Sequence, residues 1–317
     1  MAKIIPLRGF RFDPAKVRVK EVVAPPYDVI NAEQRVFLFE RHPNNIVRLT
    51  NPEAVPDDGP AENKYKRAGG ALEEWIASGI LQRDELPSIY IYEQRYQFSG
   101  DRPRVRRGFI ALARLEEQES RIILGHEQTL MPAKYDRLNL LKECRANLSP
   151  IFSIYSHPEG TVDSILEETT ASPAVYDFVD DNGVQHRFWV VNDPAVINRL
   201  TAEMEDKPLI IADGHHRYET ALIYRHIRRK EAQGDGESLH NYVMMMFVNL
   251  DSGVTIYPVH RILFDIPDFD PQVFRRNLSE YFDISSEAFN CTNCEATASQ
   301  LLKNMKDAGA QQHVFGL

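Results

Sequence analysis

The chain has 317 residues, 43% of them hydrophobic, so it is long enough to bury a core in one elaborate domain or two smaller ones. Its 46 acidic and 37 basic residues leave a net charge of -9, which opposes general nucleic-acid binding, because duplex affinity comes mostly from Lys and Arg neutralising phosphates. No apolar run approaches the roughly 20 residues of a membrane span, and "MAKIIPLRGF" lacks the apolar core of a signal peptide. We therefore expect a cytoplasmic protein, away from membranes, with a small-molecule substrate.

The first 80 residues predict extended segments followed by helices. In order, the patterns indicate extended chain at 3–12 and 22–30, a helix from 31 to about 41, a strand at 45–49, and an amphipathic helix through 65–76. Asn31 with Gln34 three residues later is typical of a capping box, and Gly79 is expected to end the second helix. Prolines interrupt both extended segments and frame an irregular loop at 25–28.

The middle of the chain alternates strands and helices with frequent hairpins. The patterns predict a hairpin from 88–98 and 106–116, a strand at 121–130, a helix stopped by Pro150, a strand at 151–155, a helix at 162–171, and a hairpin at 174–191 turning at 181–183. Residues 240–263 read as another hairpin. Because the spacing is irregular, we expect an α+β fold with a mixed sheet, hairpins and flanking helices rather than a doubly wound parallel sheet.

The predicted organisation has three parts. Residues 1–120 form an N-terminal α+β region, 121–265 a phosphate-site core, and 266–317 the start of a C-terminal region. The chain ends with "QHVFGL" inside an apolar run, which indicates that this last region is cut short.

The stretch "PLIIADGHHRYETALIY" carries the strongest chemical signal. An apolar run at 209–212 stops at Asp213-Gly214, and a helical pattern resumes after His215, His216 and Arg217. Gly214 permits a backbone conformation closed to other residues, and the amides that follow it are the unpaired N–H groups of a helix start, which attracts anions.

The side chains of this turn fit the same chemistry. Arg217 offers a planar fork for phosphate oxygens, the two histidines offer donors or a proton shuttle, and Asp213 can hold a metal ion or orient a histidine. The alternative is structural: Asp213 caps the helix, one histidine is a core residue, and Arg217 pairs with a neighbour such as Glu219.

A second group of polar residues lies at the end of the 121–130 strand and the start of the next helix: His126, Glu127, Thr129, Lys134, Asp136 and Arg137. The stretch "HEQTL" lacks the second histidine of a zinc protease. Acidic and basic groups at such a loop could instead supply a base and cationic clamps for an anionic substrate, or form the solvated face of a capped helix. We expect the His126-Glu127 loop and the turn from Asp213 to Arg217 to line a single cleft.

Two weaker candidates remain. Asp28, beside Tyr27 in a proline-stiffened loop, could act as a general base, although such loops are usually simple connections. Cys291 and Cys294 form a single CxxC pair, which offers two of the four ligands that structural zinc requires, so the sequence indicates no particular metal site.

Four stretches together resemble a known family. "RGFRFD", "APPYDVI", "GHEQT...KYDRLNLL...ANLSPIFSIY" and "IADGHHRYETAL" occur in the order typical of the domain of unknown function 1015 family, and the resemblance covers essentially the whole chain. That family normally continues beyond the point where this chain stops.

The Asp-Gly-His-His-Arg turn is also similar to the phosphate-binding turn of the ParB and sulfiredoxin superfamily, which includes free-serine kinases and CTP-dependent DNA clamps. The resemblance implies a core of that type around the strand-turn-helix at 209–225. It also implies that Gly214, His215, His216 and Arg217 bind nucleotide phosphates, with Asp213 before them. A catalytic carboxylate does not carry over cleanly, and both Asp28 and Glu127 stay candidates.

These resemblances imply a phosphotransferase that moves a phosphoryl group between a donor such as ATP, ADP or pyrophosphate and a small hydroxylated metabolite, with free serine the first acceptor to consider. Mg²⁺ is compatible with this chemistry, although no cage of ligands can be read from the sequence. The alternatives are a nucleotide-binding regulatory or DNA-associated module and a phosphoester hydrolase. Nothing in the sequence indicates an oligomeric state.

Overall fold

The computed structural model describes residues 2–97, 102–232, 236–252, 254–255, 264–288, 290 and 292–316. The chain divides into two compact units, Met1–Ile256 and Tyr257–Leu317.

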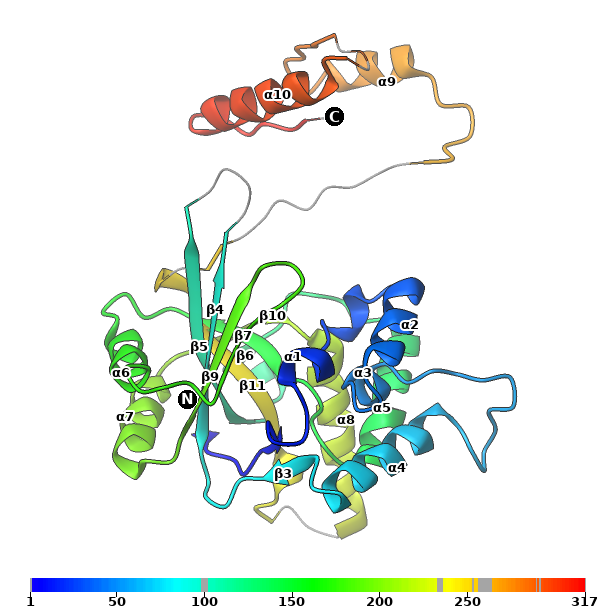
Figure 1. Cartoon of the computed structure of the whole chain (residues 1–317). Coiled ribbons are helices and arrows are strands. Elements are labelled where there is room, and N and C mark those ends of the chain that lie inside the picture. Colours follow the sequence, from blue (N-terminus) through cyan, green and yellow to red (C-terminus); the bar gives the residue numbers. More distant parts are fainter. Residues whose placement is uncertain are drawn as a thin grey trace. The chain divides into compact units, whose positions relative to one another are not determined.

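A mixed sheet forms the centre of the first unit (Figure 1). In the described part of the chain the strand order is β6-β10-β7-β11-β5-β4-β9-β8, and β1 pairs with β5. The strands are β1 (Ile4–Ile5), β4 (Ile89–Tyr96), β5 (Arg104–Arg114), β6 (Ile123–Leu124), β7 (Ile151–Tyr155), β8 (Tyr176–Val179), β9 (Gln185–Val191), β10 (Leu209–Asp213) and β11 (Tyr242–Asn249). Strands β2 (Phe10–Phe12) and β3 (Leu81–Arg83) form a separate antiparallel ribbon.

Helices flank this sheet. The first unit contains α1 (Val19–Val22), η1 (Tyr27–Val29), α2 (Ala32–Arg41), α3 (Val47–Thr50), α4 (Lys64–Ala77), η2 (Gln118–Ser120), α5 (Met131–Cys144), α6 (Thr161–Thr169), α7 (Pro194–Met204), α8 (His215–Ala232), η3 (Leu239–Asn241) and η4 (Leu250–Ser252). In Figure 1, α6 and α7 lie on one side of the strands, and α1 to α5 with α8 lie on the other. The second unit contains α9 (Pro271–Leu278) and α10 (Cys294–Gly309).

Two buried clusters hold the first unit together. The larger one joins alternate residues of the sheet to the apolar faces of α6, α7 and α8, with Phe109, Phe247 and Leu200 fully buried at its centre. The smaller one packs α3, α4 and α5 against β3 around Leu49, Trp75 and Leu140. Apolar side chains recurring with the strand or helix period produce these two layers.

The α+β fold with a mixed sheet and flanking helices is confirmed, because the sheet contains both parallel and antiparallel pairs. Several local signals acted as predicted. Asn31 and Gln34 form a reciprocal capping box at the start of α2, and Gly79 follows α4 with a φ of +70°. The hairpin of β8 and β9 turns at Gly183, whose φ is +79°.

Three element predictions need correction. The segment 22–30, predicted as extended, contains the end of α1 at Val22 and the 3-10 turn η1 at Tyr27–Val29. Residues 47–50 form the short helix α3 instead of a strand, because the Asn45 side chain accepts a hydrogen bond from Val47 N and bonds to the carbonyls of Glu21 and Val23. The strand predicted at 121–130 forms only at Ile123–Leu124, and residues 125–130 form a loop.

The structure also bears on the predicted hairpin at 240–263, the cysteine pair and membrane spans. The first arm of the hairpin predicted at 240–263 is β11, and the second arm lies outside the described residues. Cys291 also lies outside them, whereas Cys294 is exposed at the start of α10. Within the described ranges, no helix is long and apolar enough to cross a bilayer.

Candidate functional site

The sheet topology brings three chain segments to one edge. Strands β6 and β10 are parallel, so the loop after Leu124 and the turn after Asp213 leave the sheet at the same end. Strand β7 is antiparallel to β10, so its first residues begin at that end, where Phe152 lies opposite Asp213. The register shift between Ile211 and Asp213 bends β10 just before the turn.

Gly214 makes the turn possible. Its φ is +97°, a conformation that side-chain-bearing residues rarely adopt. A Cβ atom at this position would lie 3.0 Å from the guanidinium carbon of Arg217, so the guanidinium packs directly against the glycine. The sequence prediction of a special glycine at the strand-to-helix junction is therefore matched by the backbone.

His215, the first residue of α8, is buried and holds the loop after β6. Its Nε2 accepts a hydrogen bond from the backbone N–H of His126 at 3.2 Å, and the two imidazole rings meet edge to face at 4.5 Å. Its Nδ1 lies 3.0 Å from a carboxylate oxygen of Glu127, although the approach is not aligned as a hydrogen bond. Gly125 packs against the edge of the His215 ring, and a Cβ atom at Gly125 would lie 3.3 Å from His215 Cδ2.

The pKa of His215 is lowered by burial and by the neighbouring His126. The charges of Glu127, Asp213 and Glu219 favour the protonated ring but do not overcome this lowering of the pKa. Because Nε2 accepts a hydrogen bond, the neutral ring carries its proton on Nδ1, facing Glu127.

Two further residues of α8 fix the same loop. His216 Nε2 accepts a hydrogen bond from the backbone N–H of Leu130 at 3.1 Å. Glu219 accepts from the Thr129 hydroxyl at 2.6 Å and from the Lys134 ammonium at 2.9 Å. These bonds hold the pKa of Glu219 below its usual value despite partial burial. The first turns of α8 therefore determine the path of the loop.

Arg217 bonds to the protein on two sides. Its Nη1 donates to the Ser149 hydroxyl at 3.0 Å and to the Pro150 carbonyl at 2.5 Å, and its Nη2 donates to Asp213 Oδ2 at 2.6 Å. Its Nε is buried and has no hydrogen-bond partner among the described residues. The expected structural alternative was a pair with Glu219, whereas the observed carboxylate partner is Asp213.

Asp136 and Arg137 belong to a neighbouring network at the start of α5. Asp136 accepts from Lys64 at 2.6 Å, from the Tyr65 hydroxyl at 2.9 Å, and from Arg137. Burial opposes ionisation, but the Lys64 and Arg137 interactions hold the pKa of Asp136 below its usual value. The Arg137 guanidinium also lies 4.0 Å from the ring centre of Tyr27.

The 3-10 turn η1 lies close to both networks. Burial raises the pKa of Tyr27, and the charges of Arg137 and Arg217 act against that rise. Asp28 is the next residue and is exposed. The structure thus brings the segment "PPYD", the start of α5 and the turn of α8 into one region.

The region offers accessible carboxylates beside a helix start. The side chain of Glu127 is 54% exposed and that of Asp213 is 48% exposed, whereas His215 is almost fully buried. Among the described residues, no group of three or more His, Cys, Asp or Glu is arranged to hold a metal ion. The helix-start amides can bind an anion, and either carboxylate can accept a proton from a hydroxyl group.

Sequence reasoning did not identify three residues of this region. Ser149 bonds to Arg217, and Lys64 and Tyr65 bond to Asp136 across more than 70 residues of sequence. Ser149 lies within the segment "ANLSP", but its contact with Arg217 requires the antiparallel register of β7 and β10. The roles of Lys64 and Tyr65 depend on α4 packing against α5, which no local pattern encodes.

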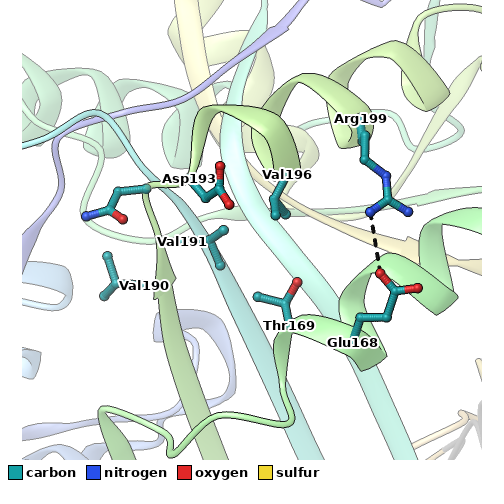
Figure 2. Close-up of a pocket in the computed structure, with 8 residues that line it drawn as sticks. Glu168, Thr169, Val190, Val191, Asp193, Val196 and Arg199 are labelled. Carbon is teal, nitrogen blue, oxygen red and sulfur yellow. Dashed lines mark hydrogen bonds and ion pairs between the residues drawn. The ribbon is translucent and has the colours of Figure 1, made fainter.

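A pocket of about 330 Å³ lies elsewhere, between α6, α7 and the end of β9 (Figure 2). Figure 2 shows Glu168 and Arg199 paired at one side of it, 3.4 Å apart, with Val191, Val196 and Thr169 beside them. Because Glu168 and Arg199 pair with each other and the Asp193 side chain caps α7 by accepting from Ala195 N, we assign the chemistry to the α8 turn.

Comparison with known proteins gives a family. No curated protein and no solved structure shows significant similarity to the chain. A family profile matches residues 4–317, which is nearly the entire sequence. The chain therefore belongs to the family described as "Protein of unknown function (DUF1015)".

Proposed function

We propose that this chain is a cytoplasmic phosphotransferase, which moves a phosphoryl group between a nucleotide or polyphosphate donor and a small hydroxylated metabolite. The observation that supports it is the contact between the Gly214 turn and the loop carrying Glu127, through His215 and His216. This arrangement sets accessible carboxylates beside the first turn of a long helix. Phosphoryl transfer requires both an anion site and a group that orients a hydroxyl.

In this proposal the donor phosphates bind the backbone N–H groups of His215, His216 and Arg217. The first amides of a helix have no intrahelical partner, and the helix dipole adds partial positive charge there. The similarity of the turn to that of the ParB and sulfiredoxin superfamily points to the same use. Arg217 shapes the turn by holding Asp213 and the chain before β7.

The side chains also suit a magnesium-bound donor. Mg²⁺ usually takes one or two carboxylates from the protein and its other ligands from phosphates and water. Asp213 and Glu127 are exposed enough to supply them. When bound, the ion would neutralise charge on the donor phosphates.

The chemical step is a displacement at phosphorus. The acceptor oxygen forms a bond to the transferred phosphorus, the bond to the donor's bridging oxygen breaks, and the hydroxyl proton passes to a carboxylate. We assign that carboxylate to Glu127, because its neighbour His215 begins the helix whose amides hold the donor. Asp28 is the alternative, since it follows Tyr27, whose ring lies against the Arg137 guanidinium at the start of α5.

Phosphorus NMR on the full chain tests the proposal. The protein is incubated with Mg²⁺ and ATP, ADP or pyrophosphate, with and without L-serine and other small alcohols. We expect a phosphomonoester signal that needs the acceptor, a loss of at least a hundredfold in rate for Glu127→Gln, and a smaller effect for Asp28→Asn.

Other outcomes reassign the site. Release of inorganic phosphate without an acceptor would indicate a hydrolase. Tight nucleotide binding with no turnover would indicate a regulatory module. A larger loss for Asp28→Asn than for Glu127→Gln would move the base to η1.

A further inference from the structure

Within the described part of the sheet, Arg106 of β5 bonds to a neutral amide. Arg106 of β5 donates from Nε to the amide oxygen of Gln94 at 3.0 Å, and Nη2 donates to the same oxygen. Gln94 lies directly opposite Arg106 in the antiparallel pair of β4 and β5. No carboxylate among the described residues pairs with this guanidinium, so its positive charge is not neutralised within that part of the chain.

The neighbouring arginines differ. Arg95, Arg107 and Arg187 all pair with the fully buried carboxylate of Glu93, at 2.8, 2.6 and 3.3 Å. Adjacent residues on a strand point to opposite faces, so Arg106 and Arg107 lie on opposite faces of the sheet. The charges of one face form an internal network, and Arg106 stands on the other face.

Arg106 extends across β11 to Phe152 of β7. Its guanidinium carbon lies 5.2 Å from the ring centre of Phe152 on β7, although β11 separates β5 from β7 in the sheet. Phe152 is the residue opposite Asp213 in the ladder of β7 and β10. One aromatic ring therefore connects the unpaired guanidinium to the residue that begins the phosphate turn.

A fixed hydrogen-bond acceptor lies on the same face. The hydroxyl of Tyr92 is 2.6 Å from His186 Nδ1, and His186 Nε2 is 3.2 Å from Asp180. Because a carboxylate only accepts, the neutral imidazole donates a hydrogen bond from Nε2 to Asp180 and accepts one from the Tyr92 hydroxyl at Nδ1. The phenol oxygen keeps its lone pairs free to accept a hydrogen bond from a ligand.

Tyr92 and Arg106 are diagonal neighbours on one face of the β4–β5 ladder, because Tyr92 lies opposite Gly108 and Gln94 lies opposite Arg106. Burial raises the pKa of Tyr92, and the charge of Arg106 is the largest influence acting against that rise. The sheet face thus presents a cation with a free edge and an adjacent acceptor oxygen. These two groups match a carboxylate and a hydroxyl or ammonium on one small molecule.

We propose that Arg106 binds the carboxylate of the acceptor, so that the acceptor is a small hydroxy acid, with Tyr92 accepting a hydrogen bond from the ammonium or second hydroxyl group on the carbon next to that carboxylate, while the reacting hydroxyl is left to Glu127. This inference rests on the proposed phosphotransferase function, in which the helix start of α8 holds the donor. Arg217 bonds to Asp213, Ser149 and Pro150, whereas one edge of the Arg106 fork is open. Arg106 is therefore the arginine of this region best placed to bind a ligand anion.

Calorimetric titration on the full chain without a donor tests it. The probes are L-serine, D-glycerate, which keeps the hydroxyl and carboxylate, ethanolamine, which lacks the carboxylate, and inorganic phosphate. We expect serine and glycerate to bind at least tenfold more tightly than ethanolamine. Arg106→Gln should remove that difference, with a loss on the order of tenfold to a hundredfold for the acids, and Arg106→Lys should restore it in part.

A matched control lies on the same strand. Arg114 is 47% exposed and only loosely paired with Glu116, at 3.7 Å, so Arg114→Gln should leave the affinities unchanged. A thermal melt of each variant verifies the fold. Equal affinity for ethanolamine and serine would overturn the inference, and so would unchanged acid binding in a folded Arg106→Gln protein. The inference would also be overturned if inorganic phosphate were the only probe that bound and Arg106→Gln abolished its binding, because Arg106 would then bind the donor and not the acceptor.

The two proposals fail in different ways. If the full chain transfers phosphate equally well to ethanolamine and serine, the function stands and the acceptor inference falls. If serine and glycerate bind through Arg106 but no donor yields a phosphomonoester, the binding site stands and the phosphotransferase falls.

Discussion

At the scale of single residues, Arg217 combines partial burial with three hydrogen bonds to protein groups. We expect Arg217→Ala to lower the free energy of unfolding by roughly 3 kcal/mol, because it removes charge-assisted bonds and leaves the Pro150 carbonyl without this donor. Thermal and denaturant unfolding of the variant measure this loss.

Arg217→Lys and Asp213→Asn serve as controls for this prediction. Lysine keeps the charge but cannot reach both sides, so we expect it to recover part of the stability. Asn at 213 can still accept one hydrogen bond from Arg217, so we expect a smaller loss. Weaker nucleotide binding by Arg217→Ala with an unchanged melting temperature would show instead that Arg217 contacts the ligand.

His215 gives the fold a dependence on pH. Burial and His126 lower its pKa below the ordinary value of 6.5 in the folded chain. As the pH falls below 6.5, the unfolded chain takes up a proton at this ring that the folded chain does not, so stability is lost. The loss is at most about 1.4 kcal/mol per pH unit and ends below the folded-state pKa.

The measurement is denaturant unfolding at pH 7.5 and pH 5.5. His215→Gln keeps an acceptor for His126 N–H and cannot titrate, so its stability should fall less between the two pH values than that of the unmodified chain. His226→Gln, at an exposed position, should behave as the unmodified chain does. An equal fall in His215→Gln would mean that other groups cause the acid sensitivity.

The sequence predicted which residues form this site, but it did not predict which distant residues they contact. The five residues from Asp213 to Arg217 are clustered along the chain, so their proximity to one another could be predicted. Their contacts with Glu127 and Ser149 span 88 and 68 residues and depend on strand order. Strand order is set by packing of the whole sheet, which local patterns do not encode.

At the scale of elements, the junction of β10 and α8 requires glycine for two reasons. Gly214 has a φ of +97°, and a Cβ there would lie 3.0 Å from the Arg217 guanidinium. We expect Gly214→Ala to destabilise the fold by roughly 2 kcal/mol, from backbone strain and displacement of Arg217. Denaturant unfolding measures the change.

Gly70 is a matched control within α4. It is exposed, and a Cβ there would meet no atom within 4 Å. Alanine is the better helix former, so Gly70→Ala should stabilise the fold by about 0.5 to 1 kcal/mol. Equal effects of the two substitutions would contradict a special role for the Gly214 backbone.

Element types followed from local signals where one signal dominated. The capping box of α2 and the glycines after α4 and in the β8–β9 turn acted as their chemistry predicts. The strand prediction for 45–49 was wrong because the Asn45 side chain caps the helical turn at 47–50, although the β-branched residues of this segment favour a strand. A side-chain bond to distant carbonyls competed successfully with local strand propensity.

At the scale of the whole molecule, burial is distributed unevenly along the chain. Both core clusters are built from residues between Ala2 and Phe247. The described part of 264–316 contains no buried residue and exposes large apolar side chains such as Phe264, Tyr281 and Phe315. Since buried apolar area is the main stabilising contribution, the first unit should hold nearly all of the folding free energy.

We therefore predict that a chain ending at Ile256 folds by itself. Its far-ultraviolet circular dichroism should show a mixed α+β spectrum, and its thermal transition should be cooperative and within a few degrees of that of the full chain, because the cut removes no described core residue. Residues 257–317 alone are expected to unfold without a cooperative transition, since roughly 60 residues with no buried core cannot offset the entropy of ordering the chain. A non-cooperative 1–256 chain, or a cooperative melt of 257–317, would show that the second unit contributes stability that its exposed side chains do not reveal.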